Sequence, residues 1–379
     1  AMIKSILNLF GSLLVGMVAG ILITVVGIAL FTDMPLSEFI QKFLSVGFSE
    51  VIISALVALV ALAVSVAILI PVHEAGHLVC GLASGYRFAS FRIFNLTFIR
   101  DRGRVRVKRF AVAGTGGQCL LAPPDRPFEE IPVLWYNIGG VVANVLALLV
   151  VLPFLWMDLN PYVKEALLIF ILVDIFFILL NGIPMQIGGI CNDAANVRLL
   201  RRDYGSKRAI MIQLRVNALV QQGVRPKDMP EEMFYVDGDV NYANPLEFYL
   251  SLCRASRLID MELWEEAYEM FAEFHAHRDK IMPLYAREVA CELIFTSLVT
   301  GRIWSAEELY TDDLKKYVEQ YRRVMSSKER MLCAVALFMD HDEERAREIC
   351  NSVRKRRSSY LMQGEVASDL AIMERILNA

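Results

Sequence analysis

Hydrophobic residues are distributed unevenly along this chain. Four long apolar runs lie in its first half, at residues 6–31, 51–82, 132–156 and 162–181. A helix needs about 20 apolar residues to cross the hydrocarbon core of a bilayer, so each run is long enough to span it. From about residue 195 the chain becomes more polar, and its apolar residues recur at helical spacing. The pattern predicts a polytopic α-helical membrane protein with about four transmembrane helices and a soluble all-α C-terminal domain.

The second apolar run ends in an unusual polar motif. His73, Glu74 and His77 form the pattern H-E-x-x-H directly after an uncharged stretch. Residues four apart lie about one helical turn apart on the same face, so both imidazoles can ligate one Zn²⁺. Glu74 beside them can serve as a general base toward the metal-bound water. The alternative is a pair of polar residues at a water-facing helix end, but ionisable groups at the end of a membrane helix need a partner.

Strand-like patterns follow this motif. Residues 91–99 are aromatic and β-branched, residues 100–103 carry a turn signal, and residues 104–108 alternate basic with apolar side chains. We expect a membrane-associated β-hairpin at 88–110, which either holds an extended peptide by strand addition or is a solvated connection. The Gly- and Pro-rich stretch 113–127 has no G-K-[ST], so we expect a loop over the active site or a plain connector, and no phosphate site.

The C-terminal region divides into a connector and a repetitive part. Residues 195–245 begin as helix and end in a turn-rich loop, and residues 246–379 show a weak internal repeat. Its marker alanines, Ala267, Ala306 and Ala346, are spaced 39 and 40 residues apart, each with a large or soft apolar residue four later. The pattern resembles degenerate tetratricopeptide repeats, which are stacked helical hairpins. Such a domain binds a protein or peptide partner or serves only to stabilise the chain.

Composition and charge narrow the class of protein. The chain of 379 residues is 55% hydrophobic and has a net charge of −3, so nothing indicates nucleic-acid binding. Its seven cysteines are scattered and predict no disulfide framework. Residues 86–110 carry eight Lys and Arg against one Asp, and residues 198–215 carry six against one. By the positive-inside rule, both termini and the H-E-x-x-H turn lie on the cytoplasmic side of the cell membrane.

The membrane helices, the H-E-x-x-H motif and the following hairpin together resemble the site-2 proteases, a family of intramembrane zinc metalloproteases. The resemblance covers roughly residues 51–195. Gly139, Gly140 and Asn144 are similar to a G-P-x-x-N-like motif of the family, with Gly140 where proline often stands. By this resemblance, Asn144 would be a catalytic residue that steadies the substrate backbone or the oxyanion. The alternative for Asn144 is a hydrogen bond between helices.

The same resemblance implies a third zinc ligand. The family pattern N-x-x-P is matched by Asn181 and Pro184, and Asp193 fits the aspartate that follows it. Asp193 lies further along than usual and precedes Ala194 instead of glycine. Asp174, inside the fourth apolar run, is a rival, because a carboxylate within a membrane helix is a functional candidate by default. We choose Asp193, since Asn181 and Pro184 end their helix near the depth of the His73 turn.

These residues lead to a functional expectation. We expect residues 1–194 to form an intramembrane zinc endopeptidase that hydrolyses peptide bonds of membrane-embedded or membrane-associated substrates. His73, His77 and Asp193 would hold the zinc, and residues 246–379 would recruit a substrate or partner in the cytosol. One alternative is a non-catalytic scaffold, chaperone or immunity-type protein that retains a metal site, although such a protein has no use for Glu74. A weaker one is a small transporter with Asp174 as its ion site.

Overall fold

The computed structural model describes residues 35, 37–38, 41, 45, 47–101, 104–109, 116–187, 190–235 and 238–378. The first expected membrane span, residues 6–31, lies outside these residues. The described chain is mostly helical and has a small antiparallel sheet. The chain divides into two compact units, residues 1–63 with 158–169 and residues 64–157 with 170–379. Helices α3 and α5 each contribute to both units.

Three long helices form the apolar part of the described residues: α3 (Phe48–Ala83), α4 (Leu134–Val151) and α5 (Pro161–Gly182). Helix α3 continues through Pro71 into the H-E-x-x-H turn. Two segments of the described chain, Phe48–Ala83 and Phe128–Trp156, are long and apolar enough to cross a membrane. Helix α5 coincides with the fourth expected span but carries Lys164, Glu165 and Asp174 and is not one of these two. The four expected spans are therefore supported in part.

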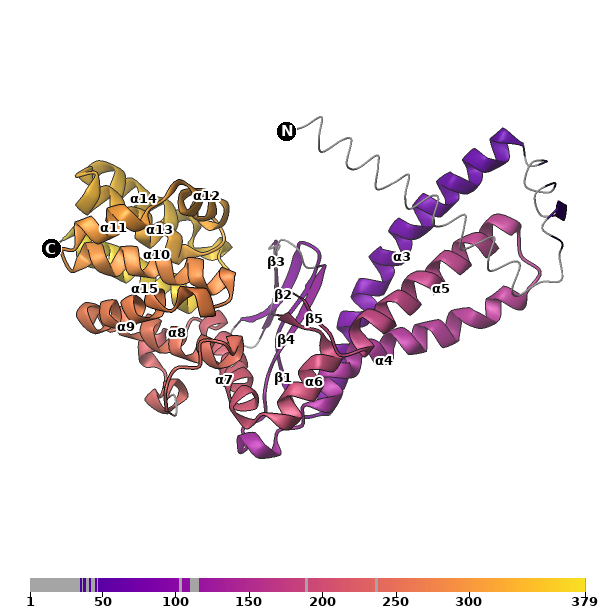
Figure 1. Cartoon of the computed structure of the whole chain (residues 1–379), viewed down its shortest axis with the longest axis horizontal. Coiled ribbons are helices and arrows are strands. Elements are labelled where there is room, and N and C mark those ends of the chain that lie inside the picture. Colours follow the sequence, from indigo (N-terminus) through magenta and orange to yellow (C-terminus); the bar gives the residue numbers. More distant parts are fainter. Residues whose placement is uncertain are drawn as a thin grey trace. The chain divides into compact units, whose positions relative to one another are not determined.

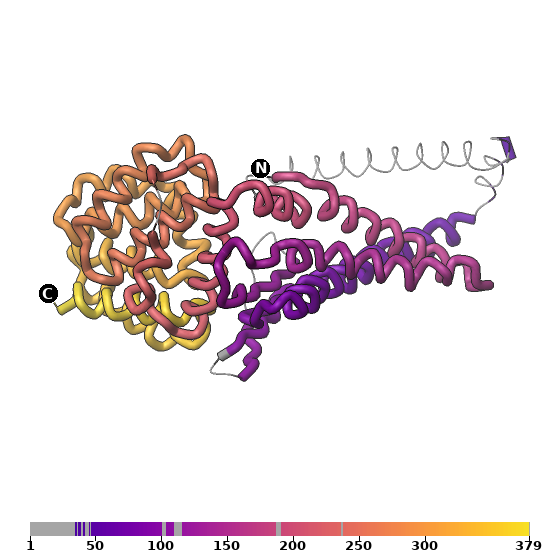
Figure 2. The backbone as a smooth tube through the Cα atoms, turned by 90° about the horizontal axis from the view of Figure 1, so that it is seen from below, coloured from indigo at the N-terminus to yellow at the C-terminus, as the bar shows by residue number. Residues whose placement is uncertain are grey.

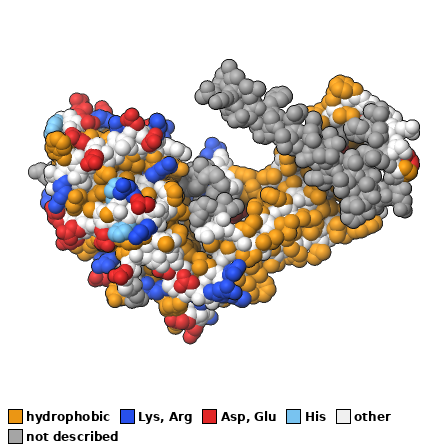
Figure 3. Space-filling model, in the orientation of Figure 1, with side chains coloured by type: hydrophobic (Ala, Val, Ile, Leu, Met, Phe, Trp, Pro, Cys, Tyr) orange, Lys and Arg blue, Asp and Glu red, His pale blue; other side chains and the backbone are white. Residues whose placement is uncertain are grey.

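The outward side chains of these helices are hydrophobic. Large apolar residues stand more than half exposed on each of them, among them Leu59, Val60, Leu146, Val150, Leu172 and Phe176. Figure 3 shows a broad hydrophobic surface there, whereas charged side chains are scattered over the helical C-terminal region. Exposed apolar surface of this extent marks a membrane or protein contact. In the first unit, Ser54 Oγ donates to Glu165 Oε1 at 2.6 Å, which gives this carboxylate a partner.

The sheet has four antiparallel strands in the order β3-β2-β1-β4 (Figure 1). Their bounds are β1 Arg87–Ile93, β2 Leu96–Asp101, β3 Arg104–Arg109 and β4 Gly117–Ala122. The expected two-stranded hairpin is wrong in detail, because the chain turns early at Phe94, whose φ is 52°, and so makes three strands. Part of the expected Gly- and Pro-rich loop is the edge strand β4, which pairs along the whole of β1.

Two short strands and two helices lead from α5 to the C-terminal domain: β5 (Gln186–Ile187), β6 (Ile190–Cys191), α6 (Asp193–Arg202) and α7 (Tyr204–Gln221). Residues from β4, α6 and α7 share a hydrophobic cluster that contains Leu121, Leu200, Met211 and Leu214. Gln221 on α7 also donates to Ser90 Oγ on β1 at 3.3 Å. The segment expected as a connector therefore covers the sheet and fixes it in place.

The C-terminal region is a stack of helices. Its elements are α8 (Pro245–Asp260), α9 (Trp264–Ala276), α10 (Pro283–Val299), α11 (Ile303–Leu309), α12 (Asp312–Tyr321), α13 (Ser326–Ala334), α14 (Glu343–Arg356) and α15 (Gln363–Leu377). Figure 2 follows the chain back and forth through them. Ala267, Ala306 and Ala346 lie on α9, α11 and α14, each fully buried in the main core. Small residues at these sites let the second helix of each hairpin pack closely.

Candidate metal centre

Helix α3 places the two histidines of the motif side by side. The His73 and His77 rings have their centroids 4.8 Å apart, and their Nε2 atoms are 3.1 Å apart. Both rings project from one face because they are one helical turn apart. His73 is buried and His77 is half-buried. The spacing in the sequence therefore becomes a pair of nitrogen atoms that point at one location.

Asp193 completes the group. It is the first residue of α6, and its Oδ2 lies 3.2 Å from His73 Nε2 and 3.4 Å from His77 Nε2. His73, His77 and Asp193 thus form a cluster that can hold a metal ion. A tetrahedral zinc site with bonds of about 2.0–2.1 Å separates neighbouring ligand atoms by about 3.3 Å. The three measured separations are close to this value.

The outer nitrogens of the two rings define how each ring is protonated. His77 Nδ1 lies 2.7 Å from the Tyr136 carbonyl oxygen, which can only accept, so this nitrogen carries the hydrogen. His73 Nδ1 lies 2.7 Å from Asn144 Oδ1, another acceptor. The neutral rings therefore point Nε2 lone pairs at each other and at the Asp193 carboxylate. Three converging acceptor atoms repel one another unless a cation lies between them, so the donor set fits a metal ion.

The charge of Asp193 suits this role. Burial disfavours its ionised form, but without a metal His73 and His77 can carry a proton on Nε2 and donate it to the carboxylate, which holds the pKa of Asp193 below its usual range. Asp193 is therefore an anion at neutral pH. A hard carboxylate with two imidazoles is a ligand set that zinc accepts.

Three glycines allow the helices to approach closely enough to form the site. A Cβ on Gly76 would lie 2.1 Å from the Gly139 carbonyl oxygen, and one on Gly139 would lie 2.4 Å from the Gly76 oxygen. A Cβ on Gly140 would lie 2.4–2.6 Å from three atoms of the His73 ring. The Gly139-Gly140 pair that the sequence offered as a family motif thus serves to seat α4 on α3 and to make room for His73.

Asn192 anchors the loop that delivers Asp193. Its Nδ2 donates to the carbonyl oxygens of Leu180 and Ile183, at 2.6 Å each. Its Oδ1 accepts from Met185 N at 3.1 Å and from Ala195 N at 2.9 Å, the latter as the N-cap of α6. One side chain therefore ties the end of α5 to the start of α6. Asn192 was not among the residues expected from the sequence, although an Asn immediately before a helical segment is a cap signal.

The two residues that matched the N-x-x-P pattern, Asn181 and Pro184, form no hydrogen bond to the loop that carries Asp193 among the contacts of the described residues. Asn181 donates to Phe177 O within its own helix at 3.1 Å, and Pro184 is exposed in the loop. Cys80 and Cys191, both free thiols, do not belong to the ligand group found among the described residues. Asn192, and not Asn181 or Pro184, therefore fixes the position of Asp193 next to the histidines.

Glu74 lies against the edge strand. A Cβ on Gly117 of β4 would lie 2.4 Å from Glu74 Cγ and 2.7 Å from its Oε1, so the side chain packs on bare backbone. Arg92 on β1, which is 2% exposed, donates to the carbonyl oxygens of Gly117 and Phe94 at 3.2 Å each. The Arg92 guanidinium also interacts favourably with the Glu74 carboxylate. The sheet thus fixes the backbone beside Glu74 and supplies a positive charge.

Asn144 is buried and not available to a substrate. It is 0% exposed, its Oδ1 contacts His73 Nδ1, and its Nδ2 donates to Asp174 Oδ1 at 2.8 Å. Asn144 therefore forms the hydrogen bonds between helices that were the alternative, and its contact with a substrate stays a prediction. Asp174, also 0% exposed, is held by Asn144 and is not a member of the ligand group. Asp193 and not Asp174 is the carboxylate next to the histidines.

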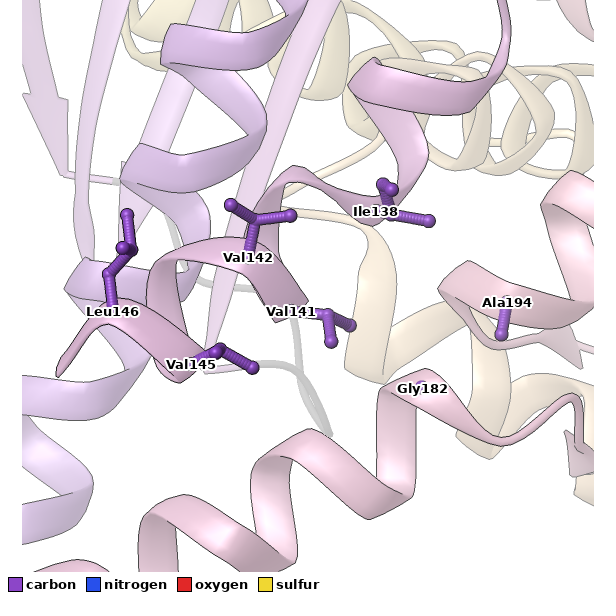
Figure 4. A pocket seen from close by; sticks show the side chains of 7 residues that line it. All are labelled: Ile138, Val141, Val142, Val145, Leu146, Gly182 and Ala194. Atoms are coloured by element: carbon purple, nitrogen blue, oxygen red, sulfur yellow. The ribbon is translucent and has the colours of Figure 1, made fainter. Parts of the chain in front are cut away.

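An apolar pocket adjoins the ligand helices (Figure 4). It has a volume of about 290 Å³ and is lined by Ile138, Val141, Val142, Val145, Leu146, Gly182 and Ala194. Val141 follows Gly140, which seats His73, and Ala194 follows Asp193. The residues beside the metal ligands thus line a hydrophobic recess between α4, the end of α5 and the start of α6.

A scan against family models and searches of curated proteins and of solved structures find no match to this chain. The function of the site has to follow from its own chemistry.

Proposed function

We propose that this protein is a membrane-embedded zinc endopeptidase that hydrolyses peptide bonds of membrane-embedded or membrane-associated substrates. The observation that supports this most is the triangle of His73 Nε2, His77 Nε2 and Asp193 Oδ2, with Glu74 beside it on the same helix. Two imidazoles and one carboxylate are a ligand set of catalytic zinc, which keeps a further position open. A purely structural site usually has four protein ligands and does not need an adjacent glutamate.

The residues of the site have separate tasks in this proposal. Zinc, when bound, would polarise the scissile carbonyl and make its water acidic enough to lose a proton near neutral pH. Glu74 takes that proton and later delivers it to the leaving amine. Arg92 holds the Gly117 backbone against which Glu74 packs, and its positive charge attracts the Glu74 carboxylate. Tyr136 O and Asn144 fix the two histidine rings.

Strand β4 is the part of the sheet suited to hold the substrate. It is an edge strand of the sheet, because it pairs with β1 along one edge only. Its residue Gly117 lies against the Glu74 side chain. An exposed strand edge can pair with an extended peptide through main-chain hydrogen bonds. An extended peptide also presents its carbonyls, which a helix keeps in its own hydrogen bonds. A peptide added to β4 would run past Glu74, so the role first expected of the hairpin passes to this edge.

The membrane setting extends the proposal. The two helices long enough to cross a bilayer support membrane association, and four spans with both termini in the cytoplasm are part of the proposal. The helical domain from α8 to α15 would bind a substrate or partner protein on the cytosolic side.

The test compares wild type with Glu74→Gln in detergent-purified full-length protein. We expect about one zinc per chain in both, and cleavage of fluorescently labelled casein, an unfolded and extended protein, by wild type alone. The expected loss is at least about 100-fold, because a positioned general base contributes 10²–10⁴-fold. Equal cleavage by the two proteins, or folded wild type without zinc, would contradict the proposal.

A further inference from the structure

Three buried side chains from three helices form a chain that ends at the metal centre. It runs from Asp174 on α5 through Asn144 on α4 to His73 on α3. We propose that Asp174 is a positioning residue, which holds the Asn144 amide in the one orientation that leaves His73 Nε2 able to bind a metal. This inference rests on the metal site of the proposed function and does not depend on proteolysis.

The geometry allows one assignment of donors and acceptors. His73 Nε2 faces His77 and Asp193, so Nδ1 must carry the hydrogen when the ring ligates a metal. That hydrogen needs an acceptor, and Asn144 Oδ1 lies 2.7 Å away. The amide of Asn144 then directs its NH₂ group to Asp174 Oδ1, at 2.8 Å. Every contact in the chain pairs a donor with an acceptor.

The reversed amide would block the site. With the NH₂ group toward His73, Nδ1 would have to accept, and its hydrogen would move to Nε2, the atom that faces Asp193. An asparagine side chain has the same shape in both orientations, so packing alone does not select one. Asp174 selects it because its Oδ1 accepts from the amide, and the reversed amide would place two oxygen acceptors face to face in a buried site.

The surroundings of Asp174 indicate that the carboxylate is kept for this purpose. The residue is fully buried in an apolar helix, and among the described residues its second oxygen, Oδ2, has no hydrogen-bond partner. Such a group is costly in a membrane helix, and an apolar residue would fill the space without that cost. A role limited to packing does not explain it.

The experiment uses isosteric variants of the full-length chain in detergent, with Zn²⁺ and Co²⁺ as probes. Asp174→Asn keeps the shape but supplies a donor and an acceptor, so it no longer selects the amide orientation. We expect a 10–100-fold loss of Zn²⁺ affinity, as found when partners of metal ligands are changed. The exposed Asp125→Asn is the matched control and should bind like wild type.

The double variant Asn144→Asp/Asp174→Asn exchanges the two side chains without changing their shapes. The carboxylate at position 144 would accept from His73 directly and from the amide at position 174. We expect Zn²⁺ affinity within about threefold of wild type and the wild-type Co²⁺ absorption spectrum. If Asp174 served only in packing, Asp174→Asn would bind Zn²⁺ as tightly as wild type. The double variant would then have no lost affinity to restore.

Either of two results would overturn the inference: Asp174→Asn that binds Zn²⁺ as tightly as wild type, or a folded double variant that binds weakly. The double variant still decides the question if Asp174→Asn does not fold. Absence of metal binding in folded wild type would remove both the proposed function and this inference. Zinc binding without casein cleavage would leave this inference standing and remove the protease.

Discussion

Two regions of this chain bury charged side chains, and they do so in opposite ways. At the metal centre, acceptor atoms of His73, His77 and Asp193 converge, and no Lys or Arg of the described residues forms an ion pair with Asp193. In the C-terminal domain, the buried ions are paired with each other. Lys328, which is 0% exposed, lies 2.7 Å from Glu288, and Arg330 bridges Glu292 and Asp369.

The difference separates a binding site from a structural network. Buried charges are tolerated when each has a partner, and such pairs are weak indicators of function. Glu329, for example, is held by Arg322 at 2.9 Å and by Arg356 at 2.8 Å. A group of converging acceptor atoms is stabilised by a cation that lies between them, which a bound metal ion can supply. The first region therefore predicts a ligand, and the second predicts a rigid domain.

The largest effect is expected from the metal ligands themselves. His73→Ala and Asp193→Ala should each abolish stoichiometric zinc binding at micromolar metal, because two ligand atoms alone hold zinc weakly. Metal content of the purified protein measures this. Lys328→Met is the matched change in the paired network and should retain one zinc per chain. If both ligand variants retained one zinc per chain, the cluster of His73, His77 and Asp193 would not be the metal site, and the contrast with the paired network would fail.

The second effect concerns stability. Lys328→Met leaves the half-buried Glu288 without its cation, which should cost up to about 3–5 kcal/mol. Lys328→Met/Glu288→Gln removes both charges and keeps an acceptor for the Tyr317 hydroxyl, so it should recover most of the loss. Thermal unfolding of the full-length protein reports both changes. Equal destabilisation in the single and double variants would show that the pair is not a unit.

A smaller effect is expected where the helices meet. Gly140→Ala would place a methyl group within the His73 ring space, so it should weaken zinc binding by about 10–100-fold, comparable to losing a partner of the ligand. Gly182→Ala is the control, since its methyl group would meet Val141 Cγ1 at an ordinary 3.5 Å. Zinc titration measures both. Unchanged zinc affinity in Gly140→Ala would mean that the His73 ring can move away from the added methyl group and still bind the metal.

The smallest effect is a pH dependence in the paired network. Burial, then Asp369 and Glu292, raise the pKa of Glu365 to about 8, against the opposing effect of Arg330. Between pH 4.5 and 8 the folded state holds a proton that the unfolded state has lost, so stability falls as pH rises through this window. Glu365→Gln should therefore raise the unfolding midpoint by about 2–4 °C at pH 8.5 and hardly change it at pH 4.5. A wild-type midpoint that rises with pH over this range, with the same slope in the variant, would contradict this sign.

Local patterns in the sequence were sufficient for some parts of this protein. The H-E-x-x-H spacing brings His73 and His77 together on one face of α3, because the helical repeat alone sets this distance. The apolar runs predicted α3, α4 and α5, and the alanine spacing identified three helices that pack in the C-terminal core. The strands were harder to predict, because the turn at Phe94 and the pairing of β4 with β1 carry weak local signals.

The metal centre shows what could not be predicted from the sequence alone. It determined which residue types were available, namely two histidines and a glutamate on one helix with two candidate aspartates further on. The tertiary structure decided that Asp193 meets the histidines while Asp174 holds Asn144. It also assigned Gly76, Gly139 and Gly140 to a close helix contact and Asn192 to the loop clamp. These roles depend on distances between segments far apart in the chain, which helical periodicity does not specify.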